Sequence, residues 1–267
     1  MKTLKKSLLA CVTACIAFTC IATPETSAKT NYEITTSAEL ENILTKEYSK
    51  LSPSFTVTYI GDTKKFLPTL LPTTQNIIAA NDKLLATVHR YSYKSSSTPT
   101  TATIQFNSSY FTTSSKQIKA DKKIKSVVNT IKKKHKSKES RIKAVNDYIV
   151  KNTRYSNNKD TLYSAYGVLY DKQAVCQGYA YTTYLMLKEL GYSAKYVTGT
   201  GNGAAHAWVM VKIGKNWYHL DTTFNDPLPD RKNKSSYTYY LVSDKTLAKT
   251  HEWNTKKYPK ALKNYKR

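Results

Sequence analysis

The sequence predicts an α+β protein of two domains, in which a small α+β domain precedes a larger domain built from a helix packed on an antiparallel sheet. Three observations favour this fold class. Residues 30–112 mix strand-like runs with helical patterns, lysine-rich amphipathic helices follow, and from residue 171 an apolar helical segment precedes three strand-like runs. A chain of 267 residues is long enough for two cores. We expect the small domain at 29–112, a basic helical connector at 113–137 and the second domain at 138–267.

The first 28 residues have the composition of a secretory signal peptide. Three lysines precede a mostly apolar run that ends near Thr23, and the small residues up to Ala28 offer a cleavage site. We therefore expect residues 1–28 to be removed and the protein to be secreted or associated with the cell wall. An uncleaved membrane anchor is the alternative. The apolar run is short for a membrane span and no basic stop follows it, which favours the signal peptide.

The small N-terminal domain is predicted from its helix and strand patterns. Thr36 and Glu39 form a capping-box pattern ahead of one helix, and a second helix is expected after Pro72. His89 lies in an alternating run, where a structural or surface role is usual, and no catalytic constellation occurs in this part of the sequence. The predicted elements are helices at 36–50 and within 66–82, and strands at 54–61, 84–96 and 100–111.

Two lysine-rich segments separate this domain from the next. Each places apolar residues on one helical face and lysines around the rest. A basic amphipathic helix can bind a membrane or nucleic acid, but packing against the following domain is the commoner explanation. The apolar faces consist of Ile118, Ile124, Val127, Val128 and Ile131 in residues 114–136, and of Ile142, Val145, Tyr148 and Ile149 in residues 139–156.

The chain carries a formal net charge of +24. In an exported protein this charge favours anionic wall polymers, a membrane surface or acidic substrates as partners, whereas nucleic acid is not expected there. A solvated, lysine-coated surface is the alternative explanation for most of these lysines.

The second domain contains the one cysteine that lies outside the predicted signal peptide. Cys176 falls at the first turn of a predicted helix that ends at Gly191. The elements expected next are a strand at 194–199, a flexible glycine-rich loop at 199–204, and strands at 205–213 and 216–223. This order places His206 at the start of one strand and Asp221 near the end of its hairpin partner.

Cys176, His206 and Asp221 have the side chains that thiol-based acyl transfer needs. A thiolate attacks a carbonyl better than a thiol, and both a helix N-terminus and a nearby imidazolium favour the thiolate. The histidine protonates the leaving amine and then activates the acceptor, while the carboxylate fixes the tautomer of the ring. The backbone N–H of Cys176 is a candidate oxyanion donor, and Gln173 and Tyr155 are open candidates for the second.

Each of the three residues also has a structural explanation. A lone cysteine is often a small buried apolar residue, and His206 or Asp221 could serve only its own strand. No zinc-type spacing of cysteine and histidine occurs, so no metal is expected. If the two strands turn at Ile213–Gly214, His206 and Asp221 lie opposite each other, whereas a turn at Lys215–Asn216 offsets them by about 13 Å. The triad therefore predicts the earlier turn, or a bulge.

The boxes VCQGYA, HAW and WYHLDTT follow one another in the order found in the bacterial transglutaminase-like superfamily. Over about residues 138–255 the sequence resembles that superfamily, whose fold is related to the papain-like cysteine proteases. The resemblance implies that Cys176 is the nucleophile, His206 the base and acid, and Asp221 the orienting carboxylate. The departures from the family's pattern, which affect the acyl or acceptor pocket, are Ala174, Val209 and Phe224–Asn225.

The triad and the resemblance together imply cysteine-dependent acyl transfer from an amide of a protein or peptide, through a thioester, to an amine or to water. The motifs do not choose between cross-linking and hydrolysis, and a cell-wall peptide is one candidate substrate. No cofactor is expected, since no acidic spacing typical of a calcium loop occurs. The alternative is a non-catalytic protein that uses this fold as a scaffold and its basic surface to bind anionic wall polymers.

Overall fold

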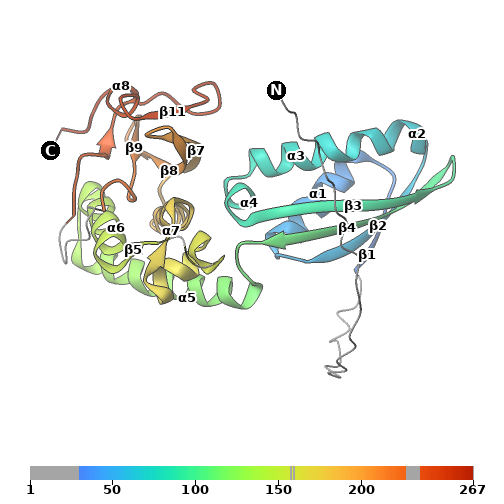
Figure 1. The fold of residues 1–267 in the computed structure, drawn as a ribbon, viewed down its shortest axis with the longest axis horizontal. Helices are drawn as coiled ribbons and strands as arrows, with labels where there is room; N and C mark the ends of the chain where they lie inside the picture. The colour runs from blue at the N-terminus through green and yellow to red at the C-terminus, as the bar shows by residue number, and fades with distance from the viewer. Residues whose placement is uncertain (1–29, 157, 159, 227–234, 267) are drawn as a thin grey trace, which may run out of the picture.

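The computed structural model describes residues 30–156, 158, 160–226 and 235–266. The described residues form one apolar core in the N-terminal sheet domain, and a larger and a smaller one in the C-terminal domain, the larger around helix α7 (Cys176–Glu189). Figure 1 shows the two corresponding bodies, the N-terminal one in blue to teal and the C-terminal one in green to red. The predicted signal peptide lies outside the described residues. None of the described helices is long and apolar enough to cross a membrane.

The N-terminal domain is a four-stranded sheet in the order β1-β2-β4-β3, with helices packed on one face. Strand alternation places Phe55, Val57, Ile104 and Phe106 on the helix side, where they are fully buried. The elements are β1 (Asn31–Ile34), α1 (Ser37–Ser49), β2 (Ser54–Ile60), α2 (Thr63–Phe66), η1 (Leu67–Thr69), α3 (Leu70–Ala80), α4 (Asp82–Thr87), β3 (Val88–Ser97) and β4 (Thr101–Tyr110).

Local signals account for the helix starts in this domain. Thr36 and Glu39 form the predicted capping box of α1, in which each side chain accepts from the backbone N–H of the other residue. Helix α3 begins at Leu70 rather than after Pro72. The proline lies in the first turn, where its missing N–H has no helical acceptor, and it is therefore tolerated inside the helix.

The strand predicted from residue 84 begins later, at Val88. The four residues before it belong to helix α4, because the Asn81 side chain accepts from two backbone N–H groups at the helix start. This cap outweighs the alternating pattern that favoured a strand.

The C-terminal domain packs α7 against a five-stranded antiparallel sheet in the order β10-β9-β8-β7-β11. Helix α7 is buried along most of its surface. The predicted α+β fold class is confirmed. The elements are α5 (Ser114–Lys134), α6 (Lys138–Asn152), β5 (Arg154–Tyr155), η2 (Asp160–Tyr163), the π-helical turn η3 (Gly167–Asp171), β6 (Gln173–Ala174), α7, β7 (Ala194–Gly201), β8 (Ala204–Ile213), β9 (Asn216–Leu220), β10 (Tyr240–Val242), α8 (Asp244–Leu247) and β11 (His251–Trp253).

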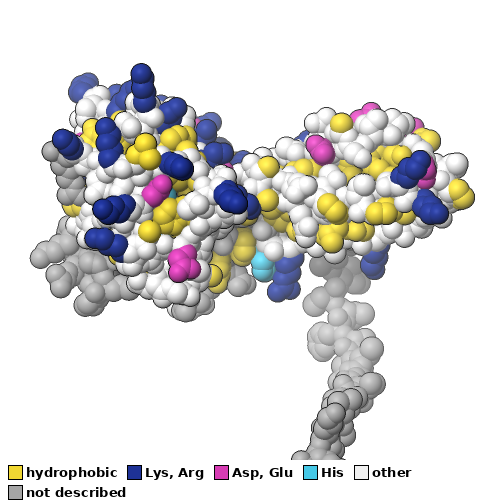
Figure 2. All heavy atoms as spheres, turned by 90° about the horizontal axis from the view of Figure 1, so that it is seen from above, with side chains coloured by type: hydrophobic (Ala, Val, Ile, Leu, Met, Phe, Trp, Pro, Cys, Tyr) yellow, Lys and Arg dark blue, Asp and Glu magenta, His cyan; other side chains and the backbone are white. Residues whose placement is uncertain are grey.

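Helix α5 contributes its apolar face to the core of the C-terminal domain. Ala120, Ile124, Val128 and Ile131 are buried in that core. Most of the predicted apolar face therefore packs against the following domain, but Ile118 is exposed, as are most of the lysines of α5. Figure 2 shows Lys and Arg side chains spread over the visible face of the C-terminal domain rather than gathered in one patch.

The two domains meet beside the start of α7. The Gln177 side chain donates from Nε2 to the backbone oxygen of Ala86 in α4 (3.0 Å). On the same side, Lys195 of β7 lies 3.6 Å from the Asp82 carboxylate. The N-terminal domain thus contacts the residue that follows Cys176.

Candidate active site

Cys176 is the first residue of α7 and is preceded by a backbone segment that the fold holds in place. Val175 is extended, and its N–H donates to the backbone oxygen of Leu162 (3.1 Å). Gly178 permits this approach, because a Cβ there would lie 2.5 Å from the same oxygen. No side chain caps the helix, so its first N–H groups favour an anion at this end. The Cys176 side chain is half-buried.

The structure brings His206 and Asp221 together, with His206 Nε2 and Asp221 Oδ2 2.7 Å apart. Neither expected turn is present, since the strand pairing places the turn between β8 and β9 at Gly214–Lys215. The prediction of an earlier turn was therefore wrong. In the observed register the two residues share a face and are offset by two positions. Diagonal neighbours of this kind have Cα atoms about 7–8 Å apart, which the two side chains span.

The glycine-rich stretch after Gly199 also differs from the prediction of a flexible loop. Strand β7 continues to Gly201, and Asn202 and Gly203 form a two-residue hairpin turn with φ of 48° and 80°. Asn-Gly is the sequence that a tight hairpin of this kind favours. The turn leads directly into β8 and places His206 two residues after the start of that strand.

Asp221 is fully buried, and the structure satisfies both of its carboxylate oxygens. Oδ1 accepts from the backbone N–H groups of Thr223 (2.9 Å) and Phe224 (3.1 Å). Oδ2 accepts from His206 (2.7 Å) and from His251 (3.0 Å). Burial alone would raise the pKa of Asp221, but the hydrogen bonds from His206 and His251 hold it below its ordinary value. The carboxylate is therefore ionised at neutral pH.

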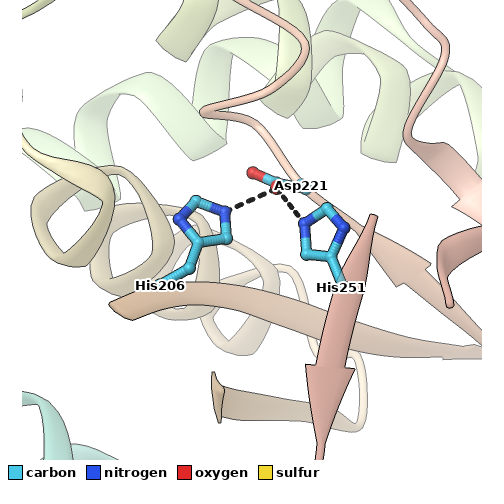
Figure 3. Close-up of side chains that lie close together, drawn as sticks. All are labelled: His206, Asp221 and His251. Atoms are coloured by element: carbon cyan, nitrogen blue, oxygen red, sulfur yellow. Dashed lines mark hydrogen bonds and ion pairs between the residues drawn. The ribbon is translucent and has the colours of Figure 1, made fainter. Parts of the chain in front are cut away.

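The electrostatic surroundings favour the charged form of His206. Burial would lower the pKa of this ring, but hydrogen bonding to Asp221 and then to Cys176, together with the charges of both groups, raises it to about 9. Since Nε2 is directed at Asp221 (Figure 3), Nδ1 is the nitrogen left for Cys176. An imidazolium between a carboxylate and a thiol is the arrangement in which a cysteine is held as thiolate.

Sequence reasoning missed His251. This residue opens β11, is 1% exposed and joins the carboxylate from the side opposite His206 (Figure 3). Its strand pairs with β7 so that His251 is opposite Gly201, and a Cβ at Gly201 would lie 2.9 Å from the His206 ring. The sequence carries no spacing signal for this contact, because β11 is remote in the chain and joins the sheet at its edge.

His206, Asp221 and His251 are also of the residue types that bind transition metals, and their ligand atoms lie within 4.8 Å of one another. Each of these atoms is already used in a hydrogen bond within the trio, and Asp221 Oδ1 is used by backbone N–H groups. The contacts of these atoms are those of a hydrogen-bonded acid–base assembly.

A cavity of about 560 Å³ opens beside His206. Its walls include Tyr155 and Phe224, and the Asp226 carboxylate at its edge accepts a hydrogen bond from Tyr179 (2.5 Å). Burial raises the pKa of Tyr155, and the nearby Cys176 contributes to the shift. Tyr155, one of the two open oxyanion candidates, therefore lies beside both the thiol and the cavity, where an acyl group could enter.

Part of the chain that contains this site is similar to a known protein family. Residues 125–222 match the family model described as the transglutaminase-like superfamily, and this segment contains Cys176, His206 and Asp221 but ends before His251. No curated protein matches the sequence.

Several solved structures are distantly similar. A crystal structure of a TGase matches at 16% identity over 88% of this chain and 70% of its own (TM-score 0.40). A candidate cysteine protease from Cytophaga hutchinsonii matches at 19% identity over 54% of this chain and 68% of its own (TM-score 0.35). The periplasmic domain of TgpA from Pseudomonas aeruginosa, bound to ethylmercury, matches at 15% identity over 51% and 60% (TM-score 0.34). These likenesses carry no argument about activity. The segment that holds Cys176, His206 and Asp221 is thus similar to the transglutaminase-like superfamily.

Proposed function

We propose that the protein is an exported cysteine enzyme that transfers the acyl group of a protein or peptide amide through a thioester on Cys176. The observation that carries this proposal is the buried His206–Asp221 pair beside a half-buried thiol at a helix start. Export rests on the predicted signal peptide, and the partner is a protein or peptide substrate, with a cell-wall peptide as one candidate.

The proposed reaction has two steps. The Cys176 thiolate attacks the amide carbonyl, and as the C–N bond breaks the leaving amine or ammonia takes the proton from His206. The backbone N–H of Cys176 is the proposed oxyanion donor. In the second step His206 removes a proton from an amine or a water molecule, which attacks the thioester and releases Cys176. Asp221 holds the ring and stabilises its charge in both steps.

Incubation with a glutamine-containing protein and a labelled primary amine tests the proposal and distinguishes the acceptors. Incorporation of label indicates transfer to an amine, whereas release of ammonia or new chain termini without label indicates hydrolysis. A covalent acyl adduct that mass spectrometry finds on the wild-type protein, and not on the Cys176→Ser variant, is the expected intermediate. Equal product formation by both proteins would contradict the proposal.

A second candidate function is binding to anionic wall polymers or a membrane surface, which the formal charge of +24, or +22 without residues 1–28, and the widely spread lysines favour. Here the fold acts only as a scaffold. Binding of teichoic acid that weakens steeply with salt and is unchanged in Cys176→Ser would support this role. If the wild-type protein forms no acyl adduct, polymer or membrane binding would become the leading candidate function.

A further inference from the structure

Two histidines share one oxygen of Asp221. His206 Nε2 lies 2.7 Å and His251 Nε2 3.0 Å from the same Oδ2 atom, and the side chains of His251 and Asp221 are completely buried. An ionised carboxylate only accepts hydrogen bonds, so both Nε2 atoms carry a hydrogen and donate. The proposed triad therefore has a fourth member on the far side of its carboxylate (Figure 3).

The surroundings of His251 keep this contact dry and fix the ring. Its other nitrogen, Nδ1, lies 2.8 Å from Thr250 Oγ1. Rings pack around it at centroid distances of 4.8 Å (Phe224), 5.0 Å (Trp208) and 5.4 Å (Tyr239). The titratable groups near His251 are Asp221, which it contacts, and His206, whose ring centroid lies 5.3 Å from that of His251. His219 is near enough for the two rings to affect each other electrostatically.

Orientation of the carboxylate does not depend on His251. The backbone N–H groups of Thr223 and Phe224 already hold Oδ1, so rotation of the Asp221 side chain is restricted without a further partner. What His251 adds is a second donor on the oxygen that His206 uses. A second donor draws negative charge from that oxygen and weakens its attraction for the His206 proton.

We propose that His251 is a positioning residue which, by sharing Asp221 Oδ2 with His206, limits how tightly Asp221 holds the proton of His206. This inference rests on the proposed function, in which His206 keeps its proton beside the thiolate and later gives it to the leaving amine. A proton held too tightly is transferred slowly. His251 acts through Asp221 and does not itself line the cavity, although its ring packs against Phe224 of the cavity wall.

The fold provides for this contact at Gly201. Strand β11 pairs with the end of β7 so that His251 is opposite Gly201, and a Cβ at that position would meet both the His206 ring (2.9 Å) and the Phe224 ring (3.0 Å). A residue with a side chain at this position would displace the His206 ring or the Phe224 ring.

Two substitutions separate donation from packing. His251→Phe keeps a ring in the buried space but removes the donor, and His251→Gln keeps an N–H donor of similar reach. His219→Phe is the matched control, since His219 is also fully buried and donates from Nε2 to a carboxylate, Asp244 (2.8 Å), but does not contact Asp221. The readout is the rate of Cys176 alkylation by iodoacetamide between pH 5 and 11, with the rate of amide turnover measured alongside.

In His251→Phe we expect the alkaline inflection of the alkylation profile, which reports loss of the His206 proton, to move up by about one pH unit. Turnover should fall about tenfold. His251→Gln should restore both values, and His219→Phe should leave the inflection in place although the protein unfolds more easily. An unchanged or lowered inflection in folded His251→Phe would overturn the proposal. If His251→Phe does not fold, His251→Gln and His251→Asn take its place. A wild-type profile in His251→Gln together with a raised inflection in His251→Asn supports the proposal. Identical profiles in the wild type, His251→Gln and His251→Asn overturn the proposal.

The alkylation profile needs no substrate, and so it separates the two proposals. A wild-type protein that shows the paired Cys176–His206 inflections but turns over no amide contradicts the proposed function, while the comparison of variants still decides the role of His251. A wild-type thiol with no sign of pairing to His206 contradicts both.

Discussion

Among the histidine–carboxylate pairs of the C-terminal domain, His206–Asp221 and His219–Asp244 are similar in distance, but the pKa values of their histidines shift in opposite directions. His206 lies 2.7 Å from Asp221, and His219 lies 2.8 Å from Asp244. The pKa of His206 is raised to about 9. Burial and the nearby His251 lower the pKa of His219 in spite of Asp244. The distance to the carboxylate alone therefore does not decide whether a buried histidine is charged.

The difference lies in what faces the other edge of each ring. The indole Nε1 of Trp208 donates to His219 Nδ1 (3.0 Å), which requires that nitrogen to be unprotonated. His206 instead has Cys176 as its other neighbour, and a thiolate stabilises a protonated ring. Asp244 is also one-third exposed, whereas Asp221 is fully buried. The Trp208 donor at Nδ1 thus keeps His219 neutral, whereas the thiol of Cys176 beside His206 favours a protonated ring.

Asp221→Asn should have the largest effect on turnover and should disrupt the His206–Asp221 pair only. Loss of the carboxylate charge removes the main support for the imidazolium, so we expect turnover to fall by about 10³-fold and the alkaline inflection of Cys176 alkylation to move to lower pH. Asp244→Asn is the matched change in the second pair and should reduce turnover by less than about threefold. Steady-state turnover and alkylation of the two variants test this, and equal losses would remove the distinction between the pairs.

The pH dependence of stability should differ in sign between the pairs. The pKa of His206 is raised from 6.5, so its contribution to the free energy of unfolding, about 3 kcal/mol, is fully present below pH 6.5 and is lost as the pH rises through about 9. The pKa of His219 is lowered, so its buried neutral ring costs stability as the pH falls below 6.5.

Urea unfolding at pH 5, 7 and 10 measures both contributions. His206→Gln should lose the stabilisation at pH 5 and 7 and resemble the wild type at pH 10. Relative to the wild type, the free energy of unfolding of His219→Gln should be higher at pH 5 than at pH 7. Variants that keep the wild-type slope across the whole range would contradict the assigned protonation states.

Gly201→Ala should disturb the reactive pair through packing alone. The added methyl group would meet the rings of His206 and Phe224, and overpacking of this kind costs about 1–3 kcal/mol. We expect turnover to fall about tenfold as the His206 ring is displaced. Gly203→Ala, in the adjacent turn, has open space around its Cβ and is strained only by its φ of 80°. Thermal unfolding and turnover of the two variants compare these causes, and a Gly203→Ala variant with the larger loss of turnover would argue against ring displacement.

Trp208→Phe should have the smallest effect and should sharpen the comparison. It removes the N–H that donates to His219 Nδ1, and loss of this hydrogen bond costs about 1 kcal/mol at pH 7, to which the smaller buried ring adds a packing cost that does not depend on pH. Without this donor, nothing on that edge opposes protonation, so the loss should shrink at pH 5. The free energy of unfolding at the two pH values tests this, and a loss that grows toward pH 5 would be inconsistent with the proposed neutral state of His219.

Much of this arrangement could be predicted from the sequence, for reasons that particular residues show. Thr36 and Glu39 mark a helix start because capping is local, and the order of the VCQGYA, HAW and WYHLDTT boxes indicates the family. The register of His206 against Asp221 was predicted wrongly, since a shift of the turn by one residue is not encoded by the alternating pattern. His251 was missed because its contact depends on pairing between β7 and the remote strand β11.

The central claim is that Cys176 and His206 form a reactive pair, and one measurement tests it most directly. The rate of Cys176 alkylation should be followed from pH 4 to 11 in the wild type and in His206→Ala. We predict that Cys176 of the wild type is alkylated faster at neutral pH than Cys176 of His206→Ala, and that only the wild-type profile has an inflection near pH 9, where His206 loses its proton. Identical profiles in both proteins would contradict the claim and leave the fold as a scaffold.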